Sequence, residues 1–363
     1  MPTSLQHRHE FNTKLTKLVG DMSAWEEKER IDADELVRIR SSIRQFQHRS
    51  TFAEEYLIGG VDGSGDYPSL SYGDSFVSIA NASGTVYRTD SSRGLTEVAS
   101  VADPNLELKN KVCHYAHTAV GLIDSLLLPA ASDVSNVGIQ LRSTAELGAA
   151  FRLISHSTKC RFVLMDTTLA LPMVSRRDLS LFYEHLKRLC CVCARQAGVI
   201  FLTISKSHSL PCIDVIEQLA AEVCGTGKKA GEHWFWRLPV PGVDDWKLSL
   251  VENRTIPPVG AVSYLVRFHA NTPVLRIDMD RRFWEQRYQN DPAAEAEMFS
   301  QLDYSSHDQR AYGYPYPIKA CHDRVRLSMA ERSALKKQII EAAVARGMKR
   351  ALFRDASATT GHV

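Results

Sequence analysis

The pattern of apolar and polar positions changes several times along this chain. Residues 5–50 are rich in charge and carry apolar residues at helical spacing, among them Leu15, Leu18 and Val19. This spacing predicts two helices with too few apolar residues for a core of their own. We therefore expect the segment to pack on a neighbouring part of the protein or on a partner subunit.

Strand patterns begin after this segment. Short apolar runs predict strands at 56–62, 76–81 and 85–88, and the turn-forming residues at 81–84 predict a turn between the last two. The sequence thus predicts three consecutive strands linked as hairpins.

The rest of the chain alternates between helix and strand patterns. Helices are predicted at 106–128, 137–155, 178–195, 281–302 and 318–350, and strands at 161–166, 199–204, 232–238, 261–268 and 273–278. Alternation of this kind is typical of α/β architecture with some parallel strands.

Composition narrows the class of protein. The chain has 363 residues, 44% of them hydrophobic and 24% charged, with a formal net charge of +2, which is typical of a globular protein with one large or two modest domains. No window approaches the roughly 18 uninterrupted apolar residues of a membrane span. The polar start, Met1 to Lys17, has no apolar stretch of the secretory type. We expect a cytoplasmic protein whose eight cysteines are reduced thiols.

Two aspartates mark the ends of predicted apolar strands. Asp62 lies in Val61-Asp62-Gly63-Ser64-Gly65, and Asp166 ends the run that starts at Arg161. If the two strands are neighbours, the carboxylates meet at one edge of the sheet, where open α/β sheets bind ligands. Paired carboxylates suit Mg²⁺ or Mn²⁺, which can stabilise both oxygens of a phosphodiester displacement. The alternative is that each aspartate only caps a turn.

Further candidates are a glutamate, a tyrosine and a histidine. Glu146, flanked by small residues on a predicted helix, could reach a metal or could simply pair with Arg142 one turn away. In the late run from Tyr312 to His322, two prolines stiffen the approach to a helix that carries His322. His322 could ligate a metal, hold a phosphate or move a proton, or it could be structural.

The order of these pieces resembles the NurA nucleases over residues 55–330. It comprises Asp-Gly-Ser after a first strand, a helical Glu, a strand-end Asp, Ile204-Ser205-Lys206 after the next strand, and a Gly-Tyr-Pro loop leading to an Ala-x-His helix. The resemblance implies an RNase H-like fold, a mixed β-sheet flanked by helices. It also implies a Mn²⁺-dependent (or Mg²⁺-dependent) DNA nuclease that works as a homodimer with the hexameric ATPase translocase HerA.

The resemblance also implies roles for individual residues. The metal ligands would be Asp62, Glu146 and Asp166, with His322 completing the metal shell or contacting the scissile phosphate. Tyr314 and Lys206 would lie near the phosphate. Two departures stand out: Thr167-Thr168 follows the second aspartate where the family has glycine, and Cys321 separates Ala320 from His322.

The predicted organisation has three parts: a helical N-terminal extension (1–50) that is an interface candidate, a NurA-like nuclease domain (51–330), and a basic C-terminal helix and tail (331–363). Between Arg324 and Arg354 there are nine basic residues and two acidic ones, so this helix could follow a DNA backbone. Its alternative is an ordinary solvated helix.

The functional hypothesis is a metal-dependent DNA nuclease. It would act as a 5′–3′ exonuclease and possible single-strand endonuclease on DNA ends, in double-strand-break repair or in defence against foreign DNA. Two alternatives stay open: a non-catalytic dimeric DNA clamp that regulates an ATPase, and an RNase H-like nuclease acting on RNA or on hybrids.

Overall fold

The computed structural model describes most of the chain. The described residues are 4–28, 33–48, 55–64, 68–72, 75–90, 94–102, 111–115, 134–155, 160–169, 177–206, 213–224, 232–240 and 260–355. None of the helices within these ranges combines the length and the apolar character needed to cross a membrane.

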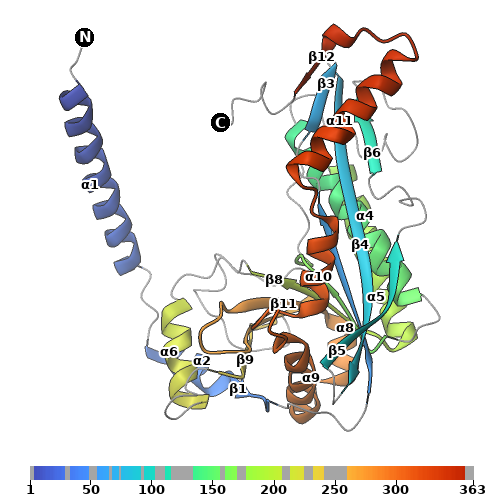
Figure 1. Cartoon of the computed structure of the whole chain (residues 1–363). Helices are drawn as coiled ribbons and strands as arrows, with labels where there is room; N and C mark the ends of the chain where they lie inside the picture. The colour runs from blue at the N-terminus through green and yellow to red at the C-terminus, as the bar shows by residue number, and fades with distance from the viewer. Residues whose placement is uncertain are drawn as a thin grey trace.

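One mixed sheet forms the centre of the molecule (Figure 1). Its strands lie in the order β1-β9-β10-β11-β8-β7-β2-β4-β3-β12, and β5 and β6 also pair with β4. The strands are β1 (Ile43–Gln45), β2 (Leu57–Ser64), β3 (Pro68–Tyr72), β4 (Ser75–Asp90), β5 (Gly94–Ala102), β6 (Lys111–Tyr115), β7 (Phe162–Met165), β8 (Ile200–Ser205), β9 (Trp234–Arg237), β10 (Ala261–Arg267), β11 (Leu275–Asp280) and β12 (Phe353–Asp355).

Helices flank this sheet on both faces. They are α1 (Ser4–Lys28), α2 (Ala33–Ser42), α4 (Val134–Ser155), α5 (Arg177–Ala197), α6 (Ile213–Cys224), α8 (Arg281–Arg287), α9 (Pro292–Ser306), α10 (Tyr316–Val325), α11 (Met329–Val344) and the 3₁₀ turn η4 (Arg350–Leu352). Helices α4 and α5 lie behind β2 and β4, α10 crosses in front of them, and α1 projects away from the body (Figure 1).

Five of the strands form the centre of the predicted mixed sheet. Strands β5, β4 and β2 are mutually antiparallel, and β7 and β8 follow beside β2 in parallel orientation. Across the sheet these strands lie in the order β5-β4-β2-β7-β8. If the five are numbered 1 to 5 along the chain, this order is 3-2-1-4-5. The predicted fold class, a mixed sheet flanked by helices, is confirmed.

The predicted turn at 81–84 is wrong. Residues 75–90 form one long strand, and Asn81 to Gly84 pair with Ser64 to Val61 of β2. Gly84 also faces Leu153 of α4, where a side chain would be crowded. The hydrogen-bond ladder and the packing thus override the local turn preference of these residues.

Two predicted helices also have different boundaries. The pattern at 281–302 is divided into α8 and α9, because Asp291 accepts a hydrogen bond from the Ala294 amide at 2.9 Å and starts a new helix before Pro292. The pattern at 318–350 is divided in the same way by a capping box at Ser328 and Glu331.

The helix predicted at 106–128 is wrong in its described part. Residues 111–115 form strand β6, which pairs with the first half of β4. The other residues of that prediction lie outside the described ranges.

The core follows the two-residue period of the strands. In β7, Val163 and Met165 pack toward α4 and α5, while Phe162 and Leu164 pack with buried residues of α9 and α10. Strand β8 repeats this division, so even-numbered positions of β7 and β8 share the face covered by α9 and α10. A third cluster joins α2 and α6 to β9 and contains the fully buried Trp234 and Trp236.

Candidate functional site

The register of the parallel strands aligns the two predicted aspartates. Strand β2 pairs with β7 so that Val61 lies beside Met165, and the next position in this register is Asp62 beside Asp166. Neighbouring strands are about 4.8 Å apart, so the two carboxyl groups leave the sheet side by side. The Asp166 amide also donates to the Val61 carbonyl at 3.2 Å, which extends the pairing to the end of both strands.

Lys206 joins the same edge of the sheet. It follows β8, whose even-numbered residues share the face on which Asp166 lies. The Lys206 ammonium lies over the Tyr314 ring at 4.3 Å, and its positive charge opposes the rise that burial causes in the pKa of Asp166. The exposed lysine therefore places its positively charged ammonium group near the carboxylates.

Helix α10 approaches this face because β2 has a glycine there. A Cβ atom at Gly60 would collide with the backbone of Pro317 in the first turn of α10. The buried Cys321 thiol lies 3.0 Å from the Gly60 carbonyl and donates to it. Since Cys321 points into the sheet, the next residue, His322, turns toward the end of the strand.

His322 and Asp62 are hydrogen-bonded. The Nδ1 atom of His322 lies 2.8 Å from Oδ2 of Asp62, while Asp62 Oδ1 accepts from the Gly63 amide at 2.7 Å. Asp62 is almost fully buried, whereas the His322 side chain is half exposed. The histidine thus connects the buried carboxylate to solvent.

Tyr314 reaches the site from the loop before α10. Gly313, with φ +79°, turns this loop, and the tyrosine that follows is buried. The Tyr314 hydroxyl is close enough to Asp166 to affect the pKa of that carboxyl, but it makes no hydrogen bond of ordinary geometry within the described residues. Burial and the nearby Asp166 carboxylate raise the pKa of Tyr314, so its hydroxyl keeps its proton beside Asp166.

Glu146 arrives from the opposite face of the sheet. It is buried on α4, pairs with Arg142 at 3.3 Å, and lies against Gly63, the residue next to Asp62. A Cβ atom at Gly63 would lie 2.7 Å from Glu146 Oε1. The absent side chain of Gly63 therefore makes the space in which the Glu146 carboxylate sits.

The aspartates have raised pKa values. Burial and the neighbouring Asp166 raise the pKa of Asp62 to about 6, against the lowering effect of the Gly63 amide and His322. Burial also raises the pKa of Asp166, against Lys206, Tyr314 and His322. A buried carboxyl group and a partly buried one that repel one another are costly without a cation, and this is the electrostatic signature of many functional sites.

Comparison with known proteins identifies the fold. No family model and no curated protein matches the sequence. Among solved structures, the NurA nuclease from Sulfolobus solfataricus aligns over 94% of this chain and 98% of its own, with a TM-score of 0.53 and 13% sequence identity. This chain has the fold of that NurA nuclease.

Other NurA structures align with lower scores. NurA with manganese covers 96% of this chain and 99% of its own at a TM-score of 0.47 and 10% identity. NurA bound to dAMP and manganese covers 95% of this chain and 98% of its own at a TM-score of 0.46 and 10% identity.

Within the NurA fold of this chain, the donor set suits a hard divalent cation. The two strand-end aspartates and Glu146 supply carboxylate oxygens near the edge of the sheet, and the buried Tyr314 hydroxyl lies beside Asp166. Mg²⁺ and Mn²⁺ prefer oxygen ligands of this kind. The donor types therefore match the metal that the resemblance implies, but the three carboxylate residues do not have ligand atoms that all lie within 4.8 Å of one another.

The sequence analysis missed the residues that hold the turn after Asp166. Asp278 of β11 accepts from the Leu169 amide at 2.9 Å, and Lys187 of α5 donates to the Thr168 carbonyl at 3.0 Å. These two hydrogen bonds hold the backbone turn at Thr167 and Thr168, where the family has glycine. Asp278 lies in a strand that alternates apolar and charged residues, and it is buried with Ser263 and Arg276 as further partners.

Proposed function

We propose that this protein is a metal-dependent nuclease that cleaves DNA. The observation that carries the proposal is the alignment of Asp62 and Asp166 at the ends of two neighbouring parallel strands, in a chain with the NurA fold. The burial of Asp62 and its repulsion by Asp166, which together raise the pKa of Asp62, support a role in binding cations.

In this proposal Asp62, Glu146 and Asp166 hold one or two Mn²⁺ or Mg²⁺ ions. Bound there, such ions would lend positive charge to the attacking and leaving oxygens of a phosphodiester. The contact of Glu146 with Arg142 then orients one donor, and the Gly63 amide orients another through Asp62 Oδ1.

The other residues of the site act on the substrate. With His322 Nδ1 held by Asp62, the ring keeps its Nε2 for a phosphate oxygen or for a proton at the surface of the protein. The Lys206 ammonium pairs with a phosphate oxygen as a point charge. The Tyr314 hydroxyl supplies a preoriented hydrogen-bond donor, because its ring is buried and lies beneath Lys206.

The proposed substrate is the end of a DNA duplex, resected from 5′ to 3′, with single-strand endonuclease action as a second activity. The basic segment from Arg324 to Arg354 supports a DNA contact, because it has nine basic residues against two acidic ones and none of the residues of α11, which it contains, is buried. The process would be double-strand-break repair or defence against foreign DNA.

Protein partners belong to the same proposal. Helix α1 exposes an apolar row, Phe11, Leu15, Leu18 and Val19, at helical spacing. Such a row supports a contact with another protein. The partners proposed are a second copy of this chain, giving a homodimer, and a HerA-type hexameric ATPase.

Matched strands of DNA, RNA and DNA–RNA hybrid, incubated with the purified protein and Mn²⁺, Mg²⁺ or a chelator, test the proposal. We expect Mn²⁺-dependent cleavage of DNA that is lost in Asp62→Asn and in Asp166→Asn. Equal cleavage by the wild type and both variants would exclude this site. Binding of DNA without cleavage by any divalent ion would favour the clamp, and preference for RNA or hybrids would favour the other nuclease.

A further inference from the structure

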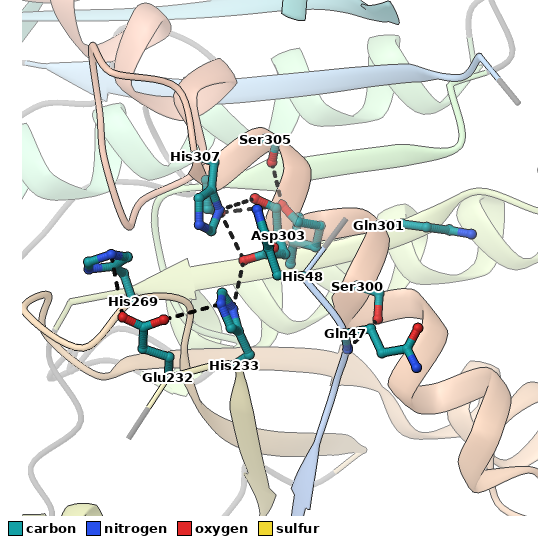
Figure 2. Close-up of polar contacts among 12 residues, drawn as sticks. Gln47, His48, Glu232, His233, His269, Ser300, Gln301, Asp303, Ser305 and His307 are labelled. Carbon is teal, nitrogen blue, oxygen red and sulfur yellow. Dashed lines mark hydrogen bonds and ion pairs between the residues drawn. The ribbon is translucent and has the colours of Figure 1, made fainter. Parts of the chain in front are cut away.

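Three histidines from distant parts of the chain meet around one buried carboxylate (Figure 2). His48 follows β1, His233 precedes β9, and His307 caps the C-terminus of α9. Asp303, one turn before His307 on α9, is fully buried between them. This histidine cluster belongs to a different part of the molecule from the strand ends of β2 and β7, and the sequence analysis did not single it out.

Each histidine presents the same ring atom to Asp303. The Nδ1 atom of His48 lies 2.7 Å from Oδ2, and the Nδ1 atoms of His307 and His233 lie 3.2 Å and 3.5 Å from Oδ1. The three rings are stacked or tilted against one another, with centroids 4.1 to 5.6 Å apart. The nitrogens therefore converge on one point instead of spreading over the surface.

Two buried atoms at the centre of the cluster, Nδ1 of His233 and Oδ1 of Asp303, lie 3.5 Å apart. This ion pair is longer than an ordinary hydrogen bond, and neither atom makes a better one among the described residues. Such a long contact satisfies the two buried atoms only weakly. His233 also holds a left-handed backbone, with φ 54°, which is uncommon for a residue other than glycine.

The separations suit a small metal ion. Metal–nitrogen bonds of about 2.0 Å in a tetrahedral site place neighbouring ligand atoms about 3.3 Å apart. The distances from Asp303 Oδ1 to His307 Nδ1 and His233 Nδ1 are 3.2 and 3.5 Å, close to this value. His48 Nδ1 lies nearer, 2.7 Å from Asp303 Oδ2, and is hydrogen-bonded to that oxygen directly. Imidazole-rich sets favour Zn²⁺ and similar transition metals over Mg²⁺, which prefers oxygen.

We propose that His48, His233, His307 and Asp303 form a second metal site, which binds Zn²⁺ or a similar transition metal. The site goes beyond the proposed nuclease centre and is structural in purpose. A bound ion would link three segments of the chain. These are the N-terminal segment with β1, the start of strand β9, and the end of helix α9. These segments already touch, since the Phe46 amide donates to the His233 carbonyl at 2.9 Å and the Gln47 amide to Ser300 at 3.1 Å.

Residues around the cluster can orient its ligands, and an ion can reach it from solvent. Glu232 lies 3.5 Å from Nε2 of His233 and 3.6 Å from Nε2 of His269, so it can orient the His233 ring from its far side (Figure 2). The Tyr312 ring packs against His269 and His307 and covers the cluster. His48 is the most exposed of the three histidines, with 35% of its side chain accessible, and an ion can enter beside it.

The test uses full-length protein carrying Asp62→Asn and Asp166→Asn, so that the proposed nuclease centre does not contribute. After treatment with a chelator, Zn²⁺ is titrated by calorimetry, and Co²⁺ is added as a spectroscopic substitute. We expect one Zn²⁺ per chain, a higher melting temperature with Zn²⁺, and the intense visible bands of tetrahedral Co²⁺.

Variants within this background separate the cluster from other histidines. His307→Gln and His48→Gln should each weaken Zn²⁺ binding at least about tenfold and remove the Co²⁺ bands, whereas His9→Gln on the exposed α1 should change neither. The Co²⁺ spectrum of the Asp62→Asn, Asp166→Asn protein, in which the histidine cluster is intact, tests the proposal even if a histidine variant misfolds. Absence of Zn²⁺ binding there, or unchanged binding in His307→Gln, would overturn it.

Discussion

His322 and Asp62 lie 260 positions apart in the sequence, yet Nδ1 of the histidine is 2.8 Å from Oδ2 of the aspartate. This bond joins helix α10 to the end of strand β2. It also directs the other ring nitrogen away from the carboxylate, toward the side from which a substrate would arrive.

Replacing His322 with alanine should slow cleavage by about 100-fold or more, the range typical of a lost proton-transfer or phosphate-binding group. Single-turnover cleavage at saturating Mn²⁺ measures the effect. Asp323→Ala, an exposed change on the same helix, serves as the control and should retain full activity. A Mn²⁺ titration of His322→Ala shows whether the ring is also a ligand, because only then does the apparent affinity fall.

Gly63→Ala should impair the site without unfolding the protein. The new methyl group meets Glu146 Oε1 at 2.7 Å and the Arg142 side chain at 2.8 Å, both of which can move, so the Glu146 carboxylate is displaced. We expect weaker Mn²⁺ binding and slower cleavage. Gly148→Ala, on α4 in open space, should instead stabilise the protein by about 0.5–1 kcal/mol. Normal Mn²⁺ affinity in Gly63→Ala would contradict the position assigned to Glu146.

Asp62→Asn should raise the stability of the metal-free protein above pH 6. Since burial and Asp166 raise the pKa of Asp62 from 3.8 to about 6, the folded state holds a proton more tightly than the unfolded state. Ionising the group therefore costs stability, on the order of 1–3 kcal/mol, and this cost is complete above pH 6 and absent below pH 4. Thermal unfolding with a chelator should show a gain for the variant at pH 8 that disappears toward pH 4. A gain that is independent of pH would rule out this electrostatic origin.

Lys187 should make the free energy of unfolding depend on pH in the alkaline range. Burial lowers its pKa from 10.5 to about 8, so the unfolded chain binds this proton between those values and the folded chain does not. Wild-type stability should thus rise, relative to Lys187→Met, as the pH increases from 8 to 10.5. Denaturant titrations of both proteins across this range measure the difference. If the stability curves of the two proteins ran parallel across this pH range, burial would not lower the pKa of Lys187.

The apolar row on α1 predicts association. Phe11 and Leu18 are 63% and 55% exposed, so aspartate at both positions should leave the body of the protein folded while removing a contact surface. Light scattering of the protein alone should show a dimer for the wild type and a monomer for the double variant. A wild-type monomer that forms a complex only with the ATPase would assign the row to that partner.

The sequence predicted most strands and helices of the central core because their periodicity reflects burial on one or two faces. It also predicted the two strand-end aspartates, since a polar residue directly after an apolar strand is a local signal. Their alignment depends on the β2–β7 register, which no local pattern contains.

The errors have the same physical origin. Asn81 to Gly84 have the composition of a turn, but the pairing with β2 and the packing of Leu153 hold them in β4. The support of the Asp166 turn by Lys187 and Asp278, and the meeting of three histidines at Asp303, arise from tertiary contacts between distant segments. Composition and residue spacing along the chain therefore do not predict these contacts.

The close approach of Pro317 to Gly60 also limits how this chain can vary during evolution. Any larger residue at position 60 must push α10 outward, and His322 would then move with the helix away from Asp62. Among homologues that keep the histidine–aspartate bond, position 60 should therefore remain glycine. Where that glycine has been replaced, the histidine should have lost its selective value and should be free to change as well.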